Sequence, residues 1–349
     1  MRFRGPDGVQ EAAADELPVA PLDLDTLELP EPYELLMPVE PPEVWCAGVT
    51  YERSRDARIE ESRIDVYSLV YDAERPEIFL KDAVCRRTVG PGRAIGVREA
   101  AVDELPVAPL DLDTLELPEP YELLMPVEPP EVWCAGVTYG RSRDARIEES
   151  RIDVYSLVYD AERPEVFLKD AVCRRTVGPG RAIGVRGDST WDVPEPELAL
   201  VLGKDGEIAG YTIGNDVSSR AIEGENPLYL PQAKLFAGAC ALGPAMLVAD
   251  GDDPGPFEIR MRVLGADGRE LFAGSTTTER MTRSFDELVA WVRRDNPVPP
   301  GSVLLTGTGL VPPDDFTLTP GQRVEITVPG IGTLVNPVAR AADLIREER

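Results

Sequence analysis

Residues 194–216 read PEPELALVLGKDGEIAGYTIGND, and this stretch decides the fold of the C-terminal part of the chain. Two apolar runs flank the dipeptide Asp205-Gly206. Apolar runs on either side of Asp-Gly are a strong short-range signal of a β-hairpin. If this dipeptide forms a two-residue turn, counting back along both arms places Glu195 directly opposite Asp216. The sequence therefore predicts a hairpin that carries acidic residues at its open end.

A third acid, Glu197, lies on the same face of the predicted hairpin as Glu195 and Asp216, because side chains two residues apart on a strand share a face. Carboxylates within cross-strand reach repel one another unless a cation compensates them. Ligands that are all oxygen atoms suit Mg²⁺, with Mn²⁺ or Ca²⁺ as alternatives. The other interpretation is a solvated hairpin at a sheet edge, because a longer turn would shift the register.

The composition restricts the class of partner. The chain has 63 Asp and Glu against 36 Lys and Arg, no histidine, and a net charge of -27. This charge argues against nucleic acid and against an anionic membrane. Lysine occurs only at positions 81, 169, 204 and 234. An acidic surface almost without lysine is typical of an extreme halophile, whose salt screens the repulsion.

The cysteines and the N-terminus predict a cytoplasmic protein. The five cysteines contain no C-x-x-C pair, which favours reduced thiols over a disulfide framework. Residues 1–6 lack the apolar core of a signal peptide, and no run of 18 apolar residues occurs.

A long internal repeat divides the chain. Residues 11–98 recur at 99–186 with an offset of 88 and three differences, which suggests a recent duplication or an artefact of sequence assembly. We expect three parts: a redundant copy without metal ligands (1–98), an N-terminal module that begins the catalytic unit (99–186), and a metal-binding catalytic domain (187–349). The second copy runs on into the hairpin and should fold with it. Alternatively the first copy displaces the second, within one chain or between chains.

The remaining pattern predicts a β-rich α+β domain. Strands are expected at 132–137, 257–264, 303–308 and 324–328, with a hairpin turn at 266–268. Helices are expected at 142–158 and at 284–294, the latter with Ser284 as its N-cap and Glu287 in the capping-box position.

Four motifs resemble the fumarylacetoacetate hydrolase superfamily: PEPELA from Pro194, GNDVSSR from Gly214, LTGT from Leu305 and GIGTLVNP from Gly330. The resemblance implies a mixed β-sandwich roll and a divalent metal held by Glu195, Glu197 and Asp216. Hydrolases of the superfamily typically carry a His-Glu pair that activates water. Here Ser142 and Ala145 stand in the places of that pair, so the resemblance does not favour hydrolysis.

Three further segments resemble the 2-keto-3-deoxy-D-arabinonate dehydratase branch: GVTYGRSRDAR from Gly136, ERPEVFLK from Glu162 and EGENPLYLPQAK from Glu223. The resemblance implies Mg²⁺-dependent loss of water from a 2-keto-3-deoxy sugar acid to give 2,5-dioxopentanoate, in oxidative pentose degradation. It assigns proton transfer to Lys234 and Glu165, with Glu162 as a near competitor of Glu165.

The same resemblance implies that Ser142, Arg143, Arg220 and Thr308 bind the substrate, and that the protein is a homo-oligomer, a dimer or a tetramer. Two alternatives stay open. One is a hydrolase, decarboxylase or tautomerase of the same superfamily acting on another 2-keto or 2,4-diketo acid. The other is a catalytically inactive metal-binding protein left by the duplication.

Overall fold

A computed structural model describes residues 124–140, 161–249 and 254–347, together with five short strands nearer the N-terminus. These strands are β1 (Arg2–Gly5), β2 (Gly8–Glu11), β3 (Glu34–Leu35), β4 (Glu43–Gly48) and β5 (Glu77–Ala83). The helix expected at 142–158 lies outside the described residues.

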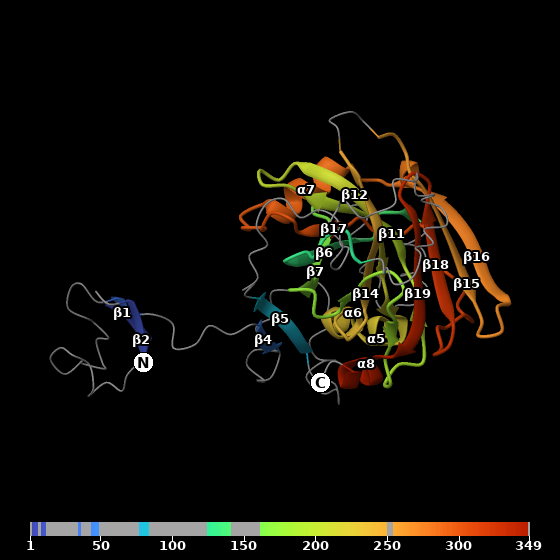
Figure 1. Cartoon of the computed structure of the whole chain (residues 1–349), viewed down its shortest axis with the longest axis horizontal. Coiled ribbons are helices and arrows are strands. Elements are labelled where there is room, and N and C mark those ends of the chain that lie inside the picture. The colour runs from blue at the N-terminus through green and yellow to red at the C-terminus, as the bar shows by residue number, and fades with distance from the viewer. Residues whose placement is uncertain are drawn as a thin grey trace, which may run out of the picture.

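The centre of the molecule is a sheet of seven strands (Figure 1). In spatial order they are β7 (Glu165–Ala171), β6 (Glu131–Gly136), β17 (Val303–Leu305), β11 (Pro196–Leu202), β12 (Ile208–Asp216), β14 (Cys240–Val248) and β8 (Thr176–Val177). Every residue of β11 is buried, which explains its continuous apolar run. The strand that carries the predicted ligand Glu197, and that Glu195 directly precedes, is therefore central and not an edge strand.

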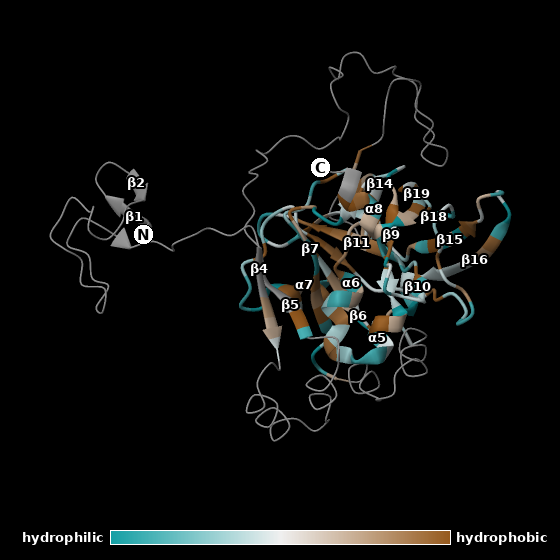
Figure 2. Ribbon diagram, turned by 90° about the horizontal axis from the view of Figure 1, so that it is seen from below, coloured by the Kyte–Doolittle hydropathy of each residue, from teal (hydrophilic) through white to brown (hydrophobic). Residues whose placement is uncertain are grey.

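A second sheet of five strands packs against the first. Its order is β16 (Glu270–Thr277), β15 (Glu258–Leu264), β18 (Arg323–Val328), β19 (Gly332–Arg340) and β9 (Ile183–Val185). Along β15 and β18 inward apolar residues alternate with outward charged or polar ones, as expected for an antiparallel sheet with one covered face. Buried apolar residues from both sheets form one continuous core, other buried residues of the seven-stranded sheet form a second cluster, and Figure 2 shows the hydrophobic strands that contribute to them.

Short elements complete the domain. They are β10 (Asp192–Val193), β13 (Ser218–Ser219), α5 (Arg220–Glu225), η2 (Pro227–Tyr229), α6 (Leu230–Lys234), η3 (Thr278–Arg280), α7 (Phe285–Arg293) and α8 (Ala341–Glu347). The predicted cap of α7 is confirmed, since the Ser284 side chain accepts from Glu287 N at 3.2 Å. The β-rich α+β class is also confirmed. None of the helices in the described residues is long and apolar enough to cross a membrane.

The hairpin β11–β12 has the predicted register at its open end but a different turn. Pro196 lies opposite Asn215 and Val201 opposite Gly210, as counted from the sequence. The two-residue turn is wrong, because Gly203 N donates to Glu207 O at 2.8 Å and encloses three residues. A β-bulge beyond Val201 takes up the extra residue and restores the pairing.

The two copies of the repeat form similar hairpins in different surroundings. In the second copy, β6 pairs in parallel with β17 and so belongs to the central sheet. In the first copy, β4 and β5 pair with each other, and β5 lies against η2 and α6 (Figure 1). The domain boundaries at 98 and 186 stay a prediction.

Candidate metal centre and active site

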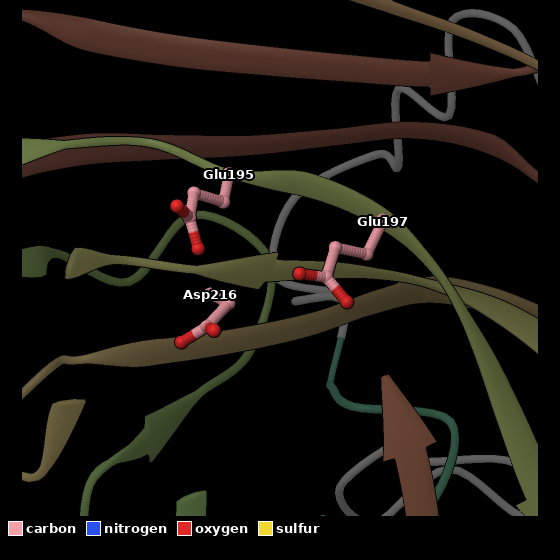
Figure 3. Close-up of side chains that lie close together, drawn as sticks. All are labelled: Glu195, Glu197 and Asp216. Carbon is pink, nitrogen blue, oxygen red and sulfur yellow. The ribbon is translucent and has the colours of Figure 1, made fainter. Parts of the chain in front are cut away.

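The three predicted metal ligands converge at the open end of the hairpin β11–β12. Glu195 lies just before β11, Glu197 lies within it, and Asp216 ends β12. Asp216 N donates to Glu195 O at 3.0 Å, so the two residues face each other as the register predicted. One oxygen from each carboxylate lies within 4.8 Å of the others, and all three side chains are buried (Figure 3). The solvated-edge interpretation is wrong, because the hairpin lies in the middle of the sheet.

Lys234, the last residue of α6, inserts its ammonium group between these carboxylates. Its Nζ donates to Glu195 Oε2 at 2.6 Å and to Asp216 Oδ2 at 2.8 Å, and it also donates to Ser218 Oγ. The side chain is fully buried. Lys234 is therefore a buried partner of the ligands and not a surface lysine.

Two further buried cations surround the centre. Lys169 Nζ, on β7, forms an ion pair with Asp216 Oδ1 and donates to Val217 O at 2.9 Å. Arg220 Nη2 forms an ion pair with Glu195 Oε1 on the side of that carboxylate away from Lys234. Asp216 is thus held between two lysines.

The charge count of this cluster leaves an excess of negative charge. Besides the three ligands, Glu223 lies 3.4 Å from Lys234 and 3.6 Å from Arg220, so four buried carboxylates meet three buried cations. Burial and the charges of Asp216 and Glu195 raise the pKa of Glu197 well above its ordinary value. An all-oxygen donor set with uncompensated negative charge fits a divalent cation such as Mg²⁺.

The negative charge of these carboxylates also affects the pKa of two neighbouring side chains, Tyr139 and Cys134. Burial, together with the charge of Glu197, raises the pKa of Tyr139. Burial and the charges of Asp216 and Glu197 raise the pKa of the Cys134 thiol. Both residues belong to the second copy of the repeat, which therefore forms part of the wall of this centre.

A small cavity opens beside the carboxylates and is lined by Phe167, Lys234, Gly307 and Thr308 among others. Gly307 N donates to Glu197 Oε2 at 2.6 Å, and Gly307 adopts a positive φ of 93°. A Cβ at this position would overlap Thr138 Oγ1, so the turn after β17 requires glycine. Thr308, predicted to bind substrate, lies at this cavity.

Glu165 begins β7 directly opposite Gly136 on β6. Its carboxylate lies across the Cα of Gly136, where any Cβ would overlap Glu165 Oε2. On the same strand Phe167 lines the cavity, and Lys169 forms the ion pair with Asp216. The competitor Glu162 is exposed and lies outside the strand, whereas Glu165 is half-buried within it, and the proton-transfer role of Glu165 stays a prediction.

The other predicted site residues have different positions. Ser142 and Arg143 lie outside the described residues. Arg220 is buried beneath Glu195 and reaches the cavity through that carboxylate. The sequence argument missed the pairing of Lys169 with Asp216, because this pair joins two strands that are far apart along the chain.

Residues 131–339 match the family described as fumarylacetoacetate (FAA) hydrolase C-terminal. This match covers more than half of the chain, and the chain therefore belongs to the fumarylacetoacetate hydrolase family.

Within that family, particular relatives are dehydratases. The chain is 56% identical over 216 residues to the probable 2-keto-3-deoxyxylonate dehydratase of Haloferax volcanii, covering 61% of this chain and 74% of that protein. It is 47% identical over 221 residues to the 2-dehydro-3-deoxy-D-arabinonate dehydratase of Saccharolobus solfataricus, covering 62% of this chain and 74% of that protein.

A solved structure has the same fold. It is a 2-keto-3-deoxy-D-arabinonate dehydratase complexed with magnesium and 2,5-dioxopentanoate. The two chains align with a TM-score of 0.59 and 44% sequence identity, over 64% of this chain and 78% of that chain.

Proposed function

We propose that this protein is a Mg²⁺-dependent hydro-lyase that removes water from a 2-keto-3-deoxy sugar acid. The proposed reaction is 2-dehydro-3-deoxy-D-arabinonate to 2,5-dioxopentanoate, within oxidative pentose degradation. The observation that carries it is the buried carboxylate triad with Lys234 inserted between two of its members. The names of the two relatives and the product bound in the similar structure support the substrate class.

Glu195, Glu197 and Asp216 would hold the metal. A bound Mg²⁺ supplies positive charge beside the carboxylate and C2 carbonyl of a 2-keto acid, which favours loss of a proton from C3. The fixed environment of each ligand supports this role. Arg220 orients Glu195, Gly307 N orients Glu197, and Lys169 orients Asp216.

The overall reaction removes a proton from C3 and the hydroxyl group from C4, which leaves as water after it gains a proton. A proton shift from C5 to C3 then converts the resulting unsaturated acid into an enol with a C4–C5 double bond, and transfer of the C5 hydroxyl proton to C4 gives the terminal aldehyde. We assign the proton transfers to Lys234 and Glu165 as a pair. Lys234 approaches from α6 and Glu165 from β7, so the two act from different elements.

The proposed substrate contacts are Ser142, Arg143 and Thr308, and Arg220 is proposed to position a metal ligand instead. Thr308 lines the cavity, and its hydroxyl group donates a hydrogen bond to Leu310 O at 3.2 Å. Arg220 acts through Glu195, whose carboxylate it holds in place. We also propose a cytoplasmic homo-oligomer, either a dimer or a tetramer, adapted to high salt.

The test is to incubate the protein with 2-dehydro-3-deoxy-D-arabinonate in molar KCl, with and without Mg²⁺, and to measure 2,5-dioxopentanoate. We expect Mg²⁺-dependent product, and we expect Lys234→Met to lower kcat by about 10²- to 10⁴-fold. Lys204→Met is the matched control, because Lys204 is exposed in the turn after β11.

Absence of product from folded protein that binds Mg²⁺ would contradict the dehydratase assignment. Turnover of another 2-keto or 2,4-diketo acid under those conditions would instead identify a hydrolase, decarboxylase or tautomerase of the family. No turnover of either substrate class would indicate a protein that only binds metal.

A further inference from the structure

The first copy of the repeat builds a second version of an active-site wall. Hairpin β4–β5 repeats hairpin β6–β7 pair for pair: Gly48 lies opposite Glu77 as Gly136 lies opposite Glu165. Both hairpins have a register shift at the same place, after Val44 in one and after Val132 in the other. In both, the glutamate carboxylate lies across the opposing glycine. The first copy thus preserves the local geometry around the proposed catalytic acid.

The strand pairing that joins hairpin β6–β7 to the rest of the sheet lies along one seam. Strand β7 of this hairpin is the outermost strand, and β6 joins the sheet through parallel pairing with β17. At this seam Val132 lies opposite Val303 and Cys134 opposite Leu305, and all four side chains are buried. Separation along this seam, with loss of the Lys169–Asp216 ion pair and of the hydrogen bond from Lys169 Nζ to Val217 O, would release the hairpin as a unit.

Hairpin β4–β5 lies close enough to use the same place. Strand β5 lies against η2 and α6, and α6 carries Lys234 beside the metal ligands. Among the described strands β4 pairs only with β5, so its other edge has no strand partner there. Residues 84–130 connect the two hairpins, and a connection of this length restricts exchange only weakly, since closure entropy rises slowly with length.

The two hairpins also offer the same contacts to β17. Within their strands they differ only at Ile78 and Val166, which is one methylene group. Neither sequence therefore has a strong advantage at the seam. Near-identical elements that compete for one position are the usual basis of swapping between protein chains.

We propose that the place beside β17 has two occupants within one chain: hairpin β6–β7 and hairpin β4–β5, which exchange. When β4–β5 occupies it, Glu77 takes the position of Glu165. The exchange itself does not depend on the proposed activity, whereas the catalytic role of Glu77 rests on it.

Thiol labelling in native buffer tests the exchange, because three cysteines report on it separately. Cys46 and Cys134 are equivalent residues of the two hairpins, and Cys46 is half-buried while Cys134 is buried. Cys240, on β14, is buried and lies outside the repeat, so it reports on global unfolding. Tryptic peptides that contain the two twin cysteines differ, because Glu52 in one is Gly140 in the other.

We expect iodoacetamide to label Cys134 much faster than Cys240 when each is compared with its own rate in denaturant. If the exchanged form is populated at about 1%, the labelling rate of Cys134 should be roughly 100-fold lower than in the unfolded chain. Labelling of Cys240 requires global unfolding, so its rate should be lower than in the unfolded chain by a factor on the order of 10³ or more. Equal protection of the two thiols would overturn the proposal.

Val44→Asp in the full chain separates exchange from fraying of β6–β7. At the seam Val44 would occupy the buried position of Val132, where an unpaired carboxylate is strongly unfavourable. We expect this variant to bring the labelling of Cys134 down to that of Cys240. Rapid labelling that persists in Val44→Asp, or labelling that rises with protein concentration, would overturn exchange within one chain.

Val132→Asp is the reciprocal variant. It should drive β6–β7 out and β4–β5 in, so that Cys134 becomes reactive and Cys46 becomes protected while Cys240 stays protected. Labelling of all three cysteines would mean unfolding and would contradict the claim that β4–β5 can replace β6–β7.

Activity gives a second, separate readout if the protein is the proposed dehydratase. The single variant Glu165→Gln should then keep residual turnover, because Glu77 replaces Glu165 in the exchanged form. The double variant with Glu165→Gln and Glu77→Gln should lose that turnover. Exchange by labelling without turnover in the wild type would count against the proposed function alone.

Discussion

At the scale of single residues, the buried carboxylates and cations of the candidate site compensate one another. They stabilise the folded protein only when all of them are present. Lys169 contacts neither Glu195 nor Glu197 by an ion pair, but it pairs with Asp216 from the side opposite Lys234. Removing one partner of a buried ion pair leaves the other charge without compensation, which costs more than the pair itself contributes.

Lys169→Met should therefore destabilise the metal-free protein by about 3–5 kcal/mol. Saturating Mg²⁺ should recover more stability in the variant than in the wild type, because the variant has a larger excess of negative charge. Denaturant unfolding with and without Mg²⁺ measures both effects. Lys204→Met is the control, since that lysine is exposed. A variant as stable as the control without metal would contradict the role of Lys169.

Asp192 gives a pH dependence outside the metal ligands. Burial raises the pKa of its carboxyl group to about 6 from an ordinary value of 3.8. Between about pH 4 and pH 6 the folded state binds the proton and the unfolded state does not, so this group's contribution to the free energy of unfolding falls as pH rises, by about 3 kcal/mol.

Asp192→Asn removes this contribution. We expect the free energy of unfolding of the variant, relative to the wild type, to be higher at pH 7 than at pH 4.5. Using the difference between the two proteins cancels the titration of the many other carboxyl groups. If the difference in free energy of unfolding between the two proteins does not change with pH, burial does not raise the pKa of Asp192.

At the scale of elements, hairpin β6–β7 sets the position of the proposed catalytic glutamate. The cross-strand pair of Gly136 and Glu165 leaves room for the carboxylate only because residue 136 has no side chain. A methyl group there meets the end of a flexible side chain, which moves at little cost to the fold.

Gly136→Ala should therefore displace Glu165 and lower kcat by about 10-fold or more, with a change in stability below about 1 kcal/mol. Gly187→Ala is the matched control, because a Cβ at that position meets open space. Steady-state kinetics and thermal unfolding measure the two quantities. Full activity in Gly136→Ala would argue against Glu165 as a proton-transfer residue.

At the scale of the whole molecule, the net charge of -27 dominates behaviour in solution. Repulsion between surface carboxylates acts over about 10 Å at 0.1 M salt and about 3 Å at 1 M. The charge thus opposes folding most strongly in dilute buffer.

We expect the melting temperature to rise by several degrees between 0.1 M and 2 M KCl, since about 1 kcal/mol shifts the midpoint of a domain of roughly 150–250 residues by about 2–4 °C. Differential scanning calorimetry in KCl and in choline chloride, which has a bulky cation, separates screening from specific K⁺ binding. A melting temperature independent of salt would contradict adaptation of the surface to high salt.

Several features of this protein were predictable from the sequence because local chemistry controls them. Alternating and continuous apolar runs gave the strands, Ser284 gave the start of α7, and the acid spacing placed Glu195 opposite Asp216. These follow from period, capping and register, which act over a few residues. The motifs also indicated the family before any fold was known.

Contacts between residues that are far apart along the chain depend on the tertiary structure. The turn after β11 is one residue longer than predicted, and a bulge corrects it because the buried faces of the sheet allow a single register. The pairing of Lys169 with Asp216 and the place of Arg220 beneath Glu195 both join elements that are far apart along the chain. Such contacts depend on packing between sheets and helices, which no local pattern encodes.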